Sequence, residues 1–260
     1  MSYNILIIMA MEKEALFLIE QYRMKRASII LDTDLHSTLY ATQFNDVTLY
    51  LVTSGKDPVH QQCDSLGSGI CFSAWEAIKV VRPNLIINIG TAGGFSKRGA
   101  KVGDIFLSAQ SFKFHDRLFA PDQKNINYGI GSYPGFDSTA LIQMTNRLGV
   151  KVGNVSTGGS MLFSQEEFLQ MEKNEAHVKE MEAAHIAAAA ARKKIPFFAI
   201  KVVSDLVDIA DGLNAQEQFE FNFDVAMKNL AIISEEIVKF VCKTRLFLKD
   251  TVREVSLVAE

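Results

Sequence analysis

Continuous aliphatic runs are the feature of this sequence that most limits how it can fold. Leu85 to Ile89 and Pro196 to Val203 are apolar stretches of the kind found where a parallel strand is covered on both faces of its sheet. Segments with helical spacing of apolar residues, such as Glu12 to Gln21, alternate with these runs. No break in composition divides the chain, so the sequence predicts a single α/β domain over residues 1–260 with a mainly parallel sheet.

The predicted core of this domain covers about residues 4–243, and residues 244–260 form a C-terminal tail. Further strands are predicted at 4–9, 38–43, 47–52, 104–109 and 152–156. Helices are predicted at 12–21, 73–81, 165–171, 181–193 and 216–242. The stretches 55–69 and 116–137 carry glycine, proline and polar residues and are predicted to be irregular.

Composition excludes several classes of function. Apolar residues make up 48% of the chain, which is ample for a folded core. The 27 basic and 30 acidic residues nearly cancel, and no dense run of lysine or arginine occurs, so the chain has no charge excess that would attract nucleic acid or an anionic membrane. The expected partner is a small, nearly neutral ligand.

The cysteines and the N-terminal residues indicate a reduced, intracellular setting. Cys63, Cys71 and Cys242 are odd in number and form no Cys-x-x-Cys pair. The first residues lack the basic region of a secretory signal, and the longest alanine-rich stretch, Ala183 to Ala191, is too short and too polar to span a bilayer. We therefore expect a cytoplasmic protein without a transmembrane segment.

Polar or glycine-rich residues follow three of the apolar runs. Glu12 and Glu14 follow the run at 4–9, Gly90 to Gly94 follows the run at 85–89, and Ser204-Asp205 follows the run that ends at Val203. Ligands of open α/β sheets bind at the carboxyl ends of strands, so these residues form a candidate site. A carboxylate at the edge of an apolar sheet loses hydration, which raises its pKa and suits Asp205 to act as a general acid.

Each of these motifs also has an ordinary structural explanation. Acidic residues that open a helix, such as Glu180 and Glu182, are favourable there whatever the function of the protein. The glycine-rich stretch is equally compatible with a tight turn, and Ser204-Asp205 with a surface turn. The spacing of residues alone therefore leads no further than an α/β enzyme with carboxylates.

Missing motifs narrow the chemistry. The five histidines show no i,i+4 pair and no grouping with cysteine, so no metal is expected. The glycine-rich stretch has neither the spacing of a dinucleotide fingerprint nor the Gly-Lys-Ser/Thr of a nucleotide-phosphate loop, so no cofactor is expected. No Gly-x-Ser-x-Gly elbow supports a nucleophilic serine.

Six motifs in one order along the chain carry a family resemblance. They are Ala10-Met11-Glu12-Lys13-Glu14, Asn88-Ile89-Gly90-Thr91-Ala92-Gly93-Gly94, Val102-Gly103-Asp104, Phe114-His115-Asp116, Glu180-Met181-Glu182-Ala183 and Ser204-Asp205. Together they resemble the 5′-methylthioadenosine/S-adenosylhomocysteine nucleosidases of the nucleoside phosphorylase superfamily. The resemblance covers the chain from about Ile5 to Val241 and is nearer to the plant-type branch than to the common bacterial one.

The resemblance implies a hydrolase with a three-layer α/β/α fold around a mixed, partly closed sheet, acting as a homodimer without a cofactor. It implies cleavage of the N-glycosidic bond of 5′-methylthioadenosine to adenine and 5-methylthioribose, in methionine salvage. The implied catalytic residues are Asp205 as the acid that protonates adenine, Glu14 as the base that deprotonates water, and Glu182 as the carboxylate that holds the ribose. The implied substrate-binding residues are Met11, Thr91, Ala92, Gly93, Met161, Leu162, Glu180, Met181 and Ser204.

Two departures from the bacterial pattern bear on substrate range. Gly159 stands where that branch has aspartate in a Ser-Gly-Asp turn, and the loop 56–67 is longer. The plant-like character favours 5′-methylthioadenosine over S-adenosylhomocysteine, and another adenine nucleoside, such as a futalosine-type substrate, stays open.

Two other functions stay open as well. Phosphorylases of the same superfamily use phosphate as the nucleophile and carry an arginine at the place of Asn88, while a carboxylate at Glu14 would repel phosphate. A non-catalytic nucleoside-binding or storage protein of this fold would have lost its catalytic carboxylates, whereas this chain retains all three.

Overall fold

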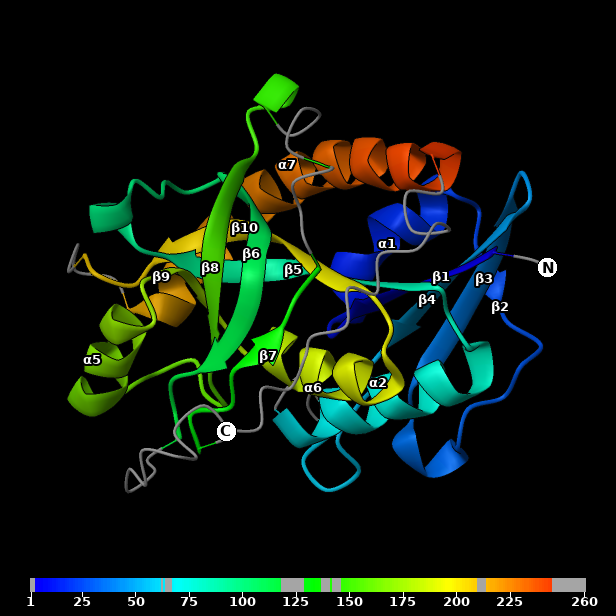
Figure 1. The fold of residues 1–260 in the computed structure, drawn as a ribbon, viewed down its shortest axis with the longest axis horizontal. Helices are drawn as coiled ribbons and strands as arrows, with labels where there is room; N and C mark the ends of the chain where they lie inside the picture. Colours follow the sequence, from blue (N-terminus) through cyan, green and yellow to red (C-terminus); the bar gives the residue numbers. More distant parts are fainter. Residues whose placement is uncertain are drawn as a thin grey trace, which may run out of the picture.

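The structure is a computed structural model that describes residues 3–61, 63, 67–117, 129–136, 141, 146–209 and 214–244. A layer of strands lies between two layers of helices (Figure 1). Helices α1 (Glu12–Gln21) and α7 (Ala215–Thr244) cover one face of the sheet, and α2 (Gly67–Val81) and α6 (Ala183–Lys193) cover the other. The three-layer α/β/α arrangement implied by the resemblance is confirmed.

All the strands named here belong to one sheet. They are β1 (Tyr3–Met9), β2 (Lys25–Arg26), β3 (Thr38–Phe44), β4 (Val47–Thr53), β5 (Leu85–Gly94), β6 (Ile105–Phe114), β7 (Tyr133–Pro134), β8 (Lys151–Thr157), β9 (Ala176–Glu180) and β10 (Phe197–Leu206). Helix α5 (Gln165–Lys173) follows β8, and short 3₁₀ helices occur at Thr33–Leu35 and Ser96–Arg98. Within the described ranges, no helix is long and apolar enough to cross a membrane.

The order of the strands closes one part of the sheet on itself. It runs β10-β6-β8-β9-β5-β1-β4-β3-β2, with β7 paired to β6. Because β10 also pairs with β5, the strands β5, β10, β6, β8 and β9 form a closed ring. Two pairs of the ring, β10–β6 and β5–β9, are antiparallel and the other three are parallel. The sheet is therefore mixed and partly closed, as the resemblance implied.

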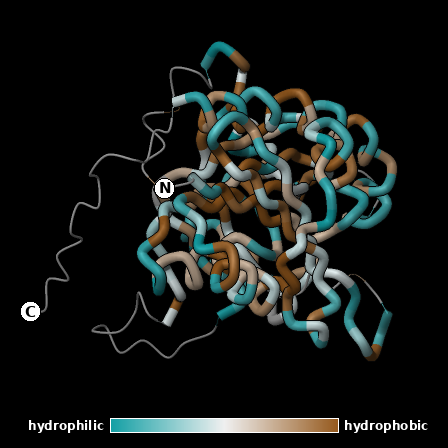
Figure 2. Tube along the Cα trace, turned by 90° about the vertical axis from the view of Figure 1, so that its right-hand side faces the viewer, coloured by the Kyte–Doolittle hydropathy of each residue, from teal (hydrophilic) through white to brown (hydrophobic). Residues whose placement is uncertain are grey.

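Alternating side chains of β1 contribute to two separate hydrophobic cores. Leu6 and Ile8 pack on the side of α2 and α6, and Ile5 and Ile7 pack on the side of α1 and α7. All four are fully buried. Hydrophobic segments accordingly concentrate in the interior of the molecule (Figure 2). Burial on both faces of the sheet explains why the strands read as continuous aliphatic runs rather than as alternating ones.

Most predicted elements lie close to their expected positions, including β1, α1 and the β3–β4 hairpin. Three predictions were wrong in their bounds: the helix at 73–81 begins at Gly67, the strand at 104–109 runs from Ile105 to Phe114, and the helix at 181–193 begins at Ala183. Strand β9 was not predicted. Residues 118–128 and 137 of the expected irregular stretch, and residues 245–260 of the expected tail, lie outside the described residues.

The stretch Gly90 to Gly94 was expected to lie beyond the end of its strand, and this expectation was wrong because β5 continues to Gly94. Gly93 pairs with Lys179 of β9 on one side and with Asp205 of β10 on the other. A Cβ atom on Gly94 would lie 2.8 Å from side-chain atoms of both Ala100 and Val203. Close packing on both sides of an extended strand, rather than a tight turn, requires these glycines.

Candidate active site

Glu14 is a buried carboxyl group with one oxygen left free. It lies in the first turn of α1, directly after β1, and is fully buried. Thr91 donates its backbone N–H to Glu14 Oε1 at 3.2 Å and its hydroxyl to the same oxygen at 2.7 Å. Glu14 Oε2 has no hydrogen-bond partner among the described residues.

The surroundings of Glu14 favour its protonated form more than water does. Burial, and then the nearby charge of Glu182, raise the pKa of Glu14 to about 7, against the opposing effects of Thr91 and Lys201. A carboxyl group with this pKa can take up or release a proton near neutral pH, which is what a general acid or base must do.

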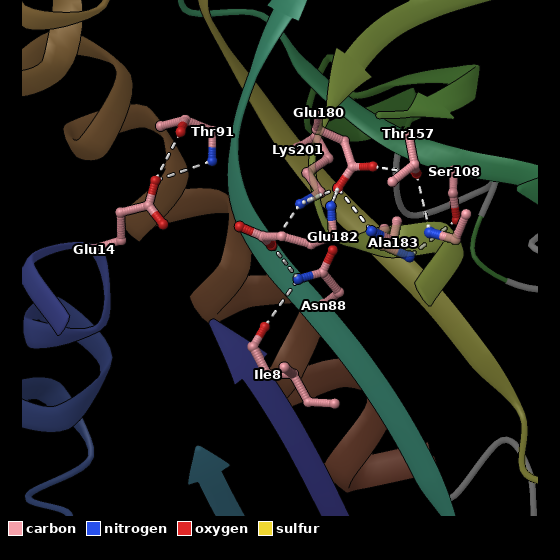
Figure 3. Close-up of polar contacts among 12 residues, drawn as sticks. Ile8, Glu14, Asn88, Thr91, Ser108, Thr157, Glu180, Glu182, Ala183 and Lys201 are labelled. Carbon is pink, nitrogen blue, oxygen red and sulfur yellow. Dashed lines mark hydrogen bonds and ion pairs between the residues drawn. The ribbon is translucent and has the colours of Figure 1, made fainter. Parts of the chain in front are cut away.

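Glu182 holds its carboxylate between two buried donors (Figure 3). Asn88 of β5 donates its side-chain amide to Glu182 Oε2 at 2.8 Å, and Lys201 of β10 donates its ammonium to the same oxygen at 3.0 Å. The Asn88 amide also donates to the carbonyl of Ile8 at 3.1 Å. Asn88 and Lys201 are fully buried, so the position of this carboxylate is fixed by the sheet itself.

Lys201 joins two carboxylates inside the ring of strands. Its Nζ lies 3.0 Å from Oε2 of Glu180 and 3.0 Å from Oε2 of Glu182. Burial lowers the pKa of Lys201, but the two carboxylates outweigh burial and raise that pKa above its usual value. Burial also works to raise the pKa of Glu180, yet Lys201 and the hydroxyl of Thr157 bring that pKa below its usual value. Lys201 and Glu180 are therefore held in their charged forms.

Glu180 ties this cluster to the backbone. Thr157 of β8 donates its hydroxyl to Glu180 Oε1 at 2.5 Å, and the backbone N–H groups of Glu182 and Ala183 donate to Oε2 at 3.0 and 2.8 Å. The side chain of Glu180 thus satisfies the N-terminus of α6, although the residue at the N-cap position is Glu182, which makes no side-chain cap bond. The interpretation of Glu182 as an ordinary helix cap was wrong. Both oxygens of Glu180 are bound by protein groups.

Gly90 of β5 lies where the charged groups converge. A Cβ atom on Gly90 would lie 3.4 Å from Glu14 Oε2, 3.5 Å from Lys201 Nζ and 3.6 Å from Glu182 Oε2. Two carboxylate oxygens and an ammonium group therefore border one small space beside Gly90, and such a set can hold a hydroxyl group or a water molecule. In the described part of the chain, no group of three or more His, Cys, Asp or Glu residues is arranged to hold a metal ion.

Asp205 is placed by an irregularity in β10. The pairing of β10 with β5 shifts between Val203 and Asp205, which is the effect of a bulge and turns the following side chain. The hydroxyl of Ser204 lies 2.8 Å from Asp205 Oδ1 and 3.3 Å from the carbonyl of Ala92. Burial raises the pKa of Asp205, and the Ser204 hydroxyl and the Lys179 ammonium oppose this effect. The direction of the shift is the one expected from the sequence.

The structure brings several implied substrate-binding residues to the carboxyl end of β5. Thr91 binds Glu14, and the backbone of Ala92 faces the Ser204 hydroxyl. Gly93 passes so close to β10 that a Cβ atom on it would lie 2.7 Å from Asp205 Oδ2. These residues therefore line the path between Glu14 and Asp205.

The remaining implied residues lie around this end of the strand. Met11, which precedes α1, lines a cavity of about 220 Å³ together with Glu12, Lys13, Gly55, Lys56 and Cys63. Met161 and Leu162 are 38% and 70% exposed, on the segment between β8 and α5. The carbonyl of Met161 accepts a hydrogen bond at 2.9 Å from Lys179, which pairs with Gly93 in the sheet. Met181 is half-buried.

Sequence reasoning missed Lys201 and Thr157, and it used Asn88 only to argue against a phosphorylase. A signal for Lys201 was present, because Lys201 is a charged residue inside the otherwise apolar run Pro196 to Val203. A lysine in a strand buried on both faces needs a carboxylate partner. Thr157 carried no such signal, since a threonine in a strand is common.

Comparison with known proteins agrees with this fold. Residues 4–239 match the family model described as "Phosphorylase superfamily", which is the class of protein that the closed ring of strands and the carboxylates beside it define. The 5′-methylthioadenosine nucleosidase of Arabidopsis thaliana is 32% identical over 92% of this chain and 87% of that protein. The 5′-methylthioadenosine/S-adenosylhomocysteine nucleosidase of the same plant is 31% identical over 94% of this chain and 91% of that protein.

The solved structures agree. The structure of Arabidopsis thaliana 5′-methylthioadenosine nucleosidase in apo form superposes with a TM-score of 0.85 at 29% identity, covering 92% of this chain and 96% of that chain. The chain belongs to the family of 5′-methylthioadenosine/S-adenosylhomocysteine nucleosidases within the phosphorylase superfamily.

The raised pKa of Glu14 predicts a stability that depends on pH. Below pH about 4.5, Glu14 is protonated in both the folded and the unfolded chain. Between pH about 4.5 and about 7, the unfolded chain has lost this proton while the folded protein still holds it, so the free energy of unfolding falls as the pH rises. We expect Glu14→Gln, which carries no charge to bury, to raise the free energy of unfolding at pH 8 by about 1–3 kcal/mol. Urea unfolding at pH 8 and pH 5 measures this gain.

The gain is expected to shrink at pH 5, where most Glu14 in the folded protein is already protonated. Glu20→Gln, which removes an exposed carboxylate from the same helix, is the matched control and is expected to change stability by less than about 0.5 kcal/mol at either pH. A Glu14→Gln variant that is less stable than wild type at pH 8 would contradict the burial argument.

Proposed function

We propose that this protein hydrolyses the N-glycosidic bond of 5′-methylthioadenosine, releasing adenine and 5-methylthioribose in methionine salvage, with S-adenosylhomocysteine as a candidate second substrate. One observation carries the proposal: the unbound Oε2 of Glu14 faces the space beside Gly90, which Glu182 and Lys201 also border. Asp205 lies farther along the same strand, beside Gly93. The carboxyl groups of Glu14 and Asp205 thus lie beside two different residues of β5, in different environments.

This arrangement matches the needs of glycosidic cleavage. The transition state carries positive charge on the sugar, and the departing adenine must gain a proton. Protonated Asp205 donates to the imidazole-ring nitrogen of adenine, so that adenine leaves as a neutral molecule. Water attacks the anomeric carbon, and Glu14 Oε2 accepts the proton that this water loses. One proton therefore enters through Asp205 and one leaves through Glu14.

In this proposal, Glu182 binds the ribose of the substrate. Its Oε2 is held by Asn88 and Lys201, and its carboxylate borders the space beside Gly90. A carboxylate fixed in this way accepts hydrogen bonds from ribose hydroxyls and favours the positive charge that develops on the ring. Because the donors are rigid parts of β5 and β10, the carboxylate needs no reorganisation when the substrate binds.

The geometry favours water over phosphate as the nucleophile. A phosphorylase must hold a dianion with cationic side chains. Lys201, the ammonium group that reaches this space, is bound by two carboxylates and is therefore neutralised by them. The free oxygen of Glu14 would repel phosphate. Asn88, at the place where phosphorylases carry arginine, donates to a carboxylate instead.

A binding or storage role is disfavoured by the burial and the raised pKa of Glu14. A protein that only binds its ligand gains nothing from a buried Glu14 with a pKa of about 7, because burial of an ionisable group costs free energy. A buried carboxyl group with a strongly raised pKa is typical of catalytic sites. We propose further that the chain acts as a single domain over residues 1–260, as a homodimer in the cytoplasm, without a metal or cofactor.

The primary test is adenine release from 5′-methylthioadenosine by the purified protein, with and without phosphate. We expect release at the same rate in both buffers, and a rate lower by about 10²–10⁴-fold in Asp205→Asn, because the amide cannot protonate the leaving group. Asp224→Asn, which changes an exposed aspartate of α7, is the matched control and should keep the wild-type rate.

Each alternative has its own outcome in this assay. Release that requires phosphate would identify a phosphorylase, and tight binding of the nucleoside without release in either buffer would identify a binding protein. The same assay with S-adenosylhomocysteine and adenosine ranks the substrates. We expect 5′-methylthioadenosine to be cleaved most efficiently, since its 5′ group brings neither the charged groups of S-adenosylhomocysteine nor the 5′-hydroxyl of adenosine, which must lose hydration.

Gly90→Ala tests the space beside the carboxylates without removing them. The added methyl group would lie at ordinary contact distance, 3.4–3.6 Å, from Glu14, Lys201 and Glu182, so the fold should tolerate it. We expect an unchanged or higher Tm, because alanine has fewer unfolded conformations than glycine, together with a kcat/KM that is lower by at least about 10²-fold, since the methyl group occupies the space of the attacking water. A folded Gly90→Ala variant with wild-type activity would place the nucleophile elsewhere.

A further inference from the structure

Lys179 is a second buried lysine, and the proposed mechanism does not use it. It lies on β9 between Ser156 of β8 and Gly93 of β5, and the residue is 7% exposed. Burial lowers the pKa of Lys179, and the charges of Asp205, Glu180 and Glu167 oppose this effect. Burial of an ammonium group costs free energy unless polar groups bind it, so its partners indicate its role.

The partners of Lys179 are two consecutive carbonyl groups. Its ammonium donates to the carbonyl of Ser160 at 2.8 Å and to that of Met161 at 2.9 Å, on the segment between β8 and α5. The two ends of this segment are also fixed. Asp116 accepts the N–H of Gly159 at 2.7 Å, and Ser164 forms a capping box with Glu167 at the start of α5. Lys179 holds the middle of the segment.

Holding a carbonyl also fixes the direction of the next amide. The C=O of one residue and the N–H of the following residue belong to one planar, trans peptide unit and point in opposite directions. With the carbonyls of Ser160 and Met161 directed at the ammonium, the N–H groups of Met161 and Leu162 point away from it. One side chain thereby aligns two successive hydrogen-bond donors on an exposed segment.

The family resemblance implies that the backbone at Met161 and Leu162 contacts the edge of the adenine ring. We propose that Lys179 is the positioning residue for this contact: by binding the carbonyls of Ser160 and Met161, it directs the N–H groups of Met161 and Leu162 toward that edge. This inference rests on the proposed function, because it names how that site selects its base. A preset amide donor matches a ring-nitrogen acceptor of adenine, and it loses little conformational entropy when the base binds.

The charge of Lys179 also acts on the group that is proposed to protonate the base. It lowers the pKa of Asp205, against the effect of burial. The other titratable groups around Lys179 are Glu167, Glu180 and His115, and burial followed by the charge of Lys179 lowers the pKa of His115 to about 4. His115 is therefore neutral at physiological pH, and the ammonium group faces acidic neighbours and a neutral ring.

Lys179→Met tests the role, because methionine keeps most of the length of the side chain and removes the ammonium. We expect weaker binding of adenine, measured as its Kd by isothermal titration calorimetry, and a higher KM for the nucleoside substrate. Each constant should rise about 10-fold, or ~1.4 kcal/mol, with a smaller change in kcat. Lys179→Arg, which retains a charge and donors, should stay within about 3-fold of wild type. Lys173→Met changes an exposed lysine at the end of α5 and is the matched control.

A second readout separates positioning from a merely structural role. In Lys179→Met the alkaline limb of the kcat/KM profile should move to higher pH, because loss of the neighbouring cation raises the pKa of Asp205, which must be protonated to act. A folded Lys179→Met variant with wild-type adenine affinity and an unmoved alkaline limb overturns the proposal. Lower thermal stability alone does not support it.

A measurement on the wild-type protein keeps the proposal testable if the variant fails to fold. The probe is 1-deazaadenine, in which carbon replaces one ring nitrogen, and we expect it to bind at least about 10-fold more weakly than adenine. Equal affinity overturns the role of the two amides. A wild-type protein that neither cleaves 5′-methylthioadenosine nor binds adenine would instead refute the proposed function, whereas an active wild type matched by Lys179→Met refutes this inference alone.

Discussion

The site depends on the ion pairs that the buried ammonium of Lys201 forms with Glu180 and Glu182. The ammonium lies 3.0 Å from carboxylate oxygens of both Glu180 and Glu182, inside a ring of five strands. Without this cation two carboxylates would face each other in a medium that screens charge poorly. Buried ion pairs contribute little net stability, because the loss of hydration offsets the attraction. What the cluster provides is position: Thr157 and the start of α6 bind the carboxylate of Glu180, and Asn88 binds that of Glu182.

Outside this cluster, the protein keeps a third carboxyl group in a different state. Among the described residues, Glu14 has a hydroxyl and an amide as partners but no cation in direct contact, and its pKa rises to about 7, whereas Lys201 and Thr157 lower the pKa of Glu180. Groups of one chemical type are thereby assigned to different tasks by their surroundings. Glu180, which binds Lys201, stays charged, and Glu14, which can exchange a proton, keeps a free oxygen toward Gly90.

Sequence reasoning was most successful where local and global preferences agreed. The strands β1 and β5 were predicted from continuous apolar runs, and the helices α1 and α7 from helical periodicity, because burial of these elements produces both patterns. Strand β9 was missed because it has only five residues, Ala176–Glu180, and ends in lysine and glutamate, which are disfavoured in strands. The positions of Glu14 and Asp205 came from family motifs, while the contacts of Lys201 and Lys179 depend on strands far apart in sequence and could not be predicted from spacing.

The glycines of β5 show why one feature misled the sequence interpretation and yet marked the site. Glycine disfavours a strand, so Gly90 to Gly94 looked like the end of one. In the structure the strand continues because it is paired on both sides, and the missing Cβ atoms make room for side chains of other elements. At Gly90 the room is bordered by Glu14, Glu182 and Lys201, and at Gly93 by Asp205. Gly90 and Gly93 weaken the strand locally, but they also let these four ionisable side chains approach it. The closed ring of strands provides the pairing that keeps the glycines in an extended strand.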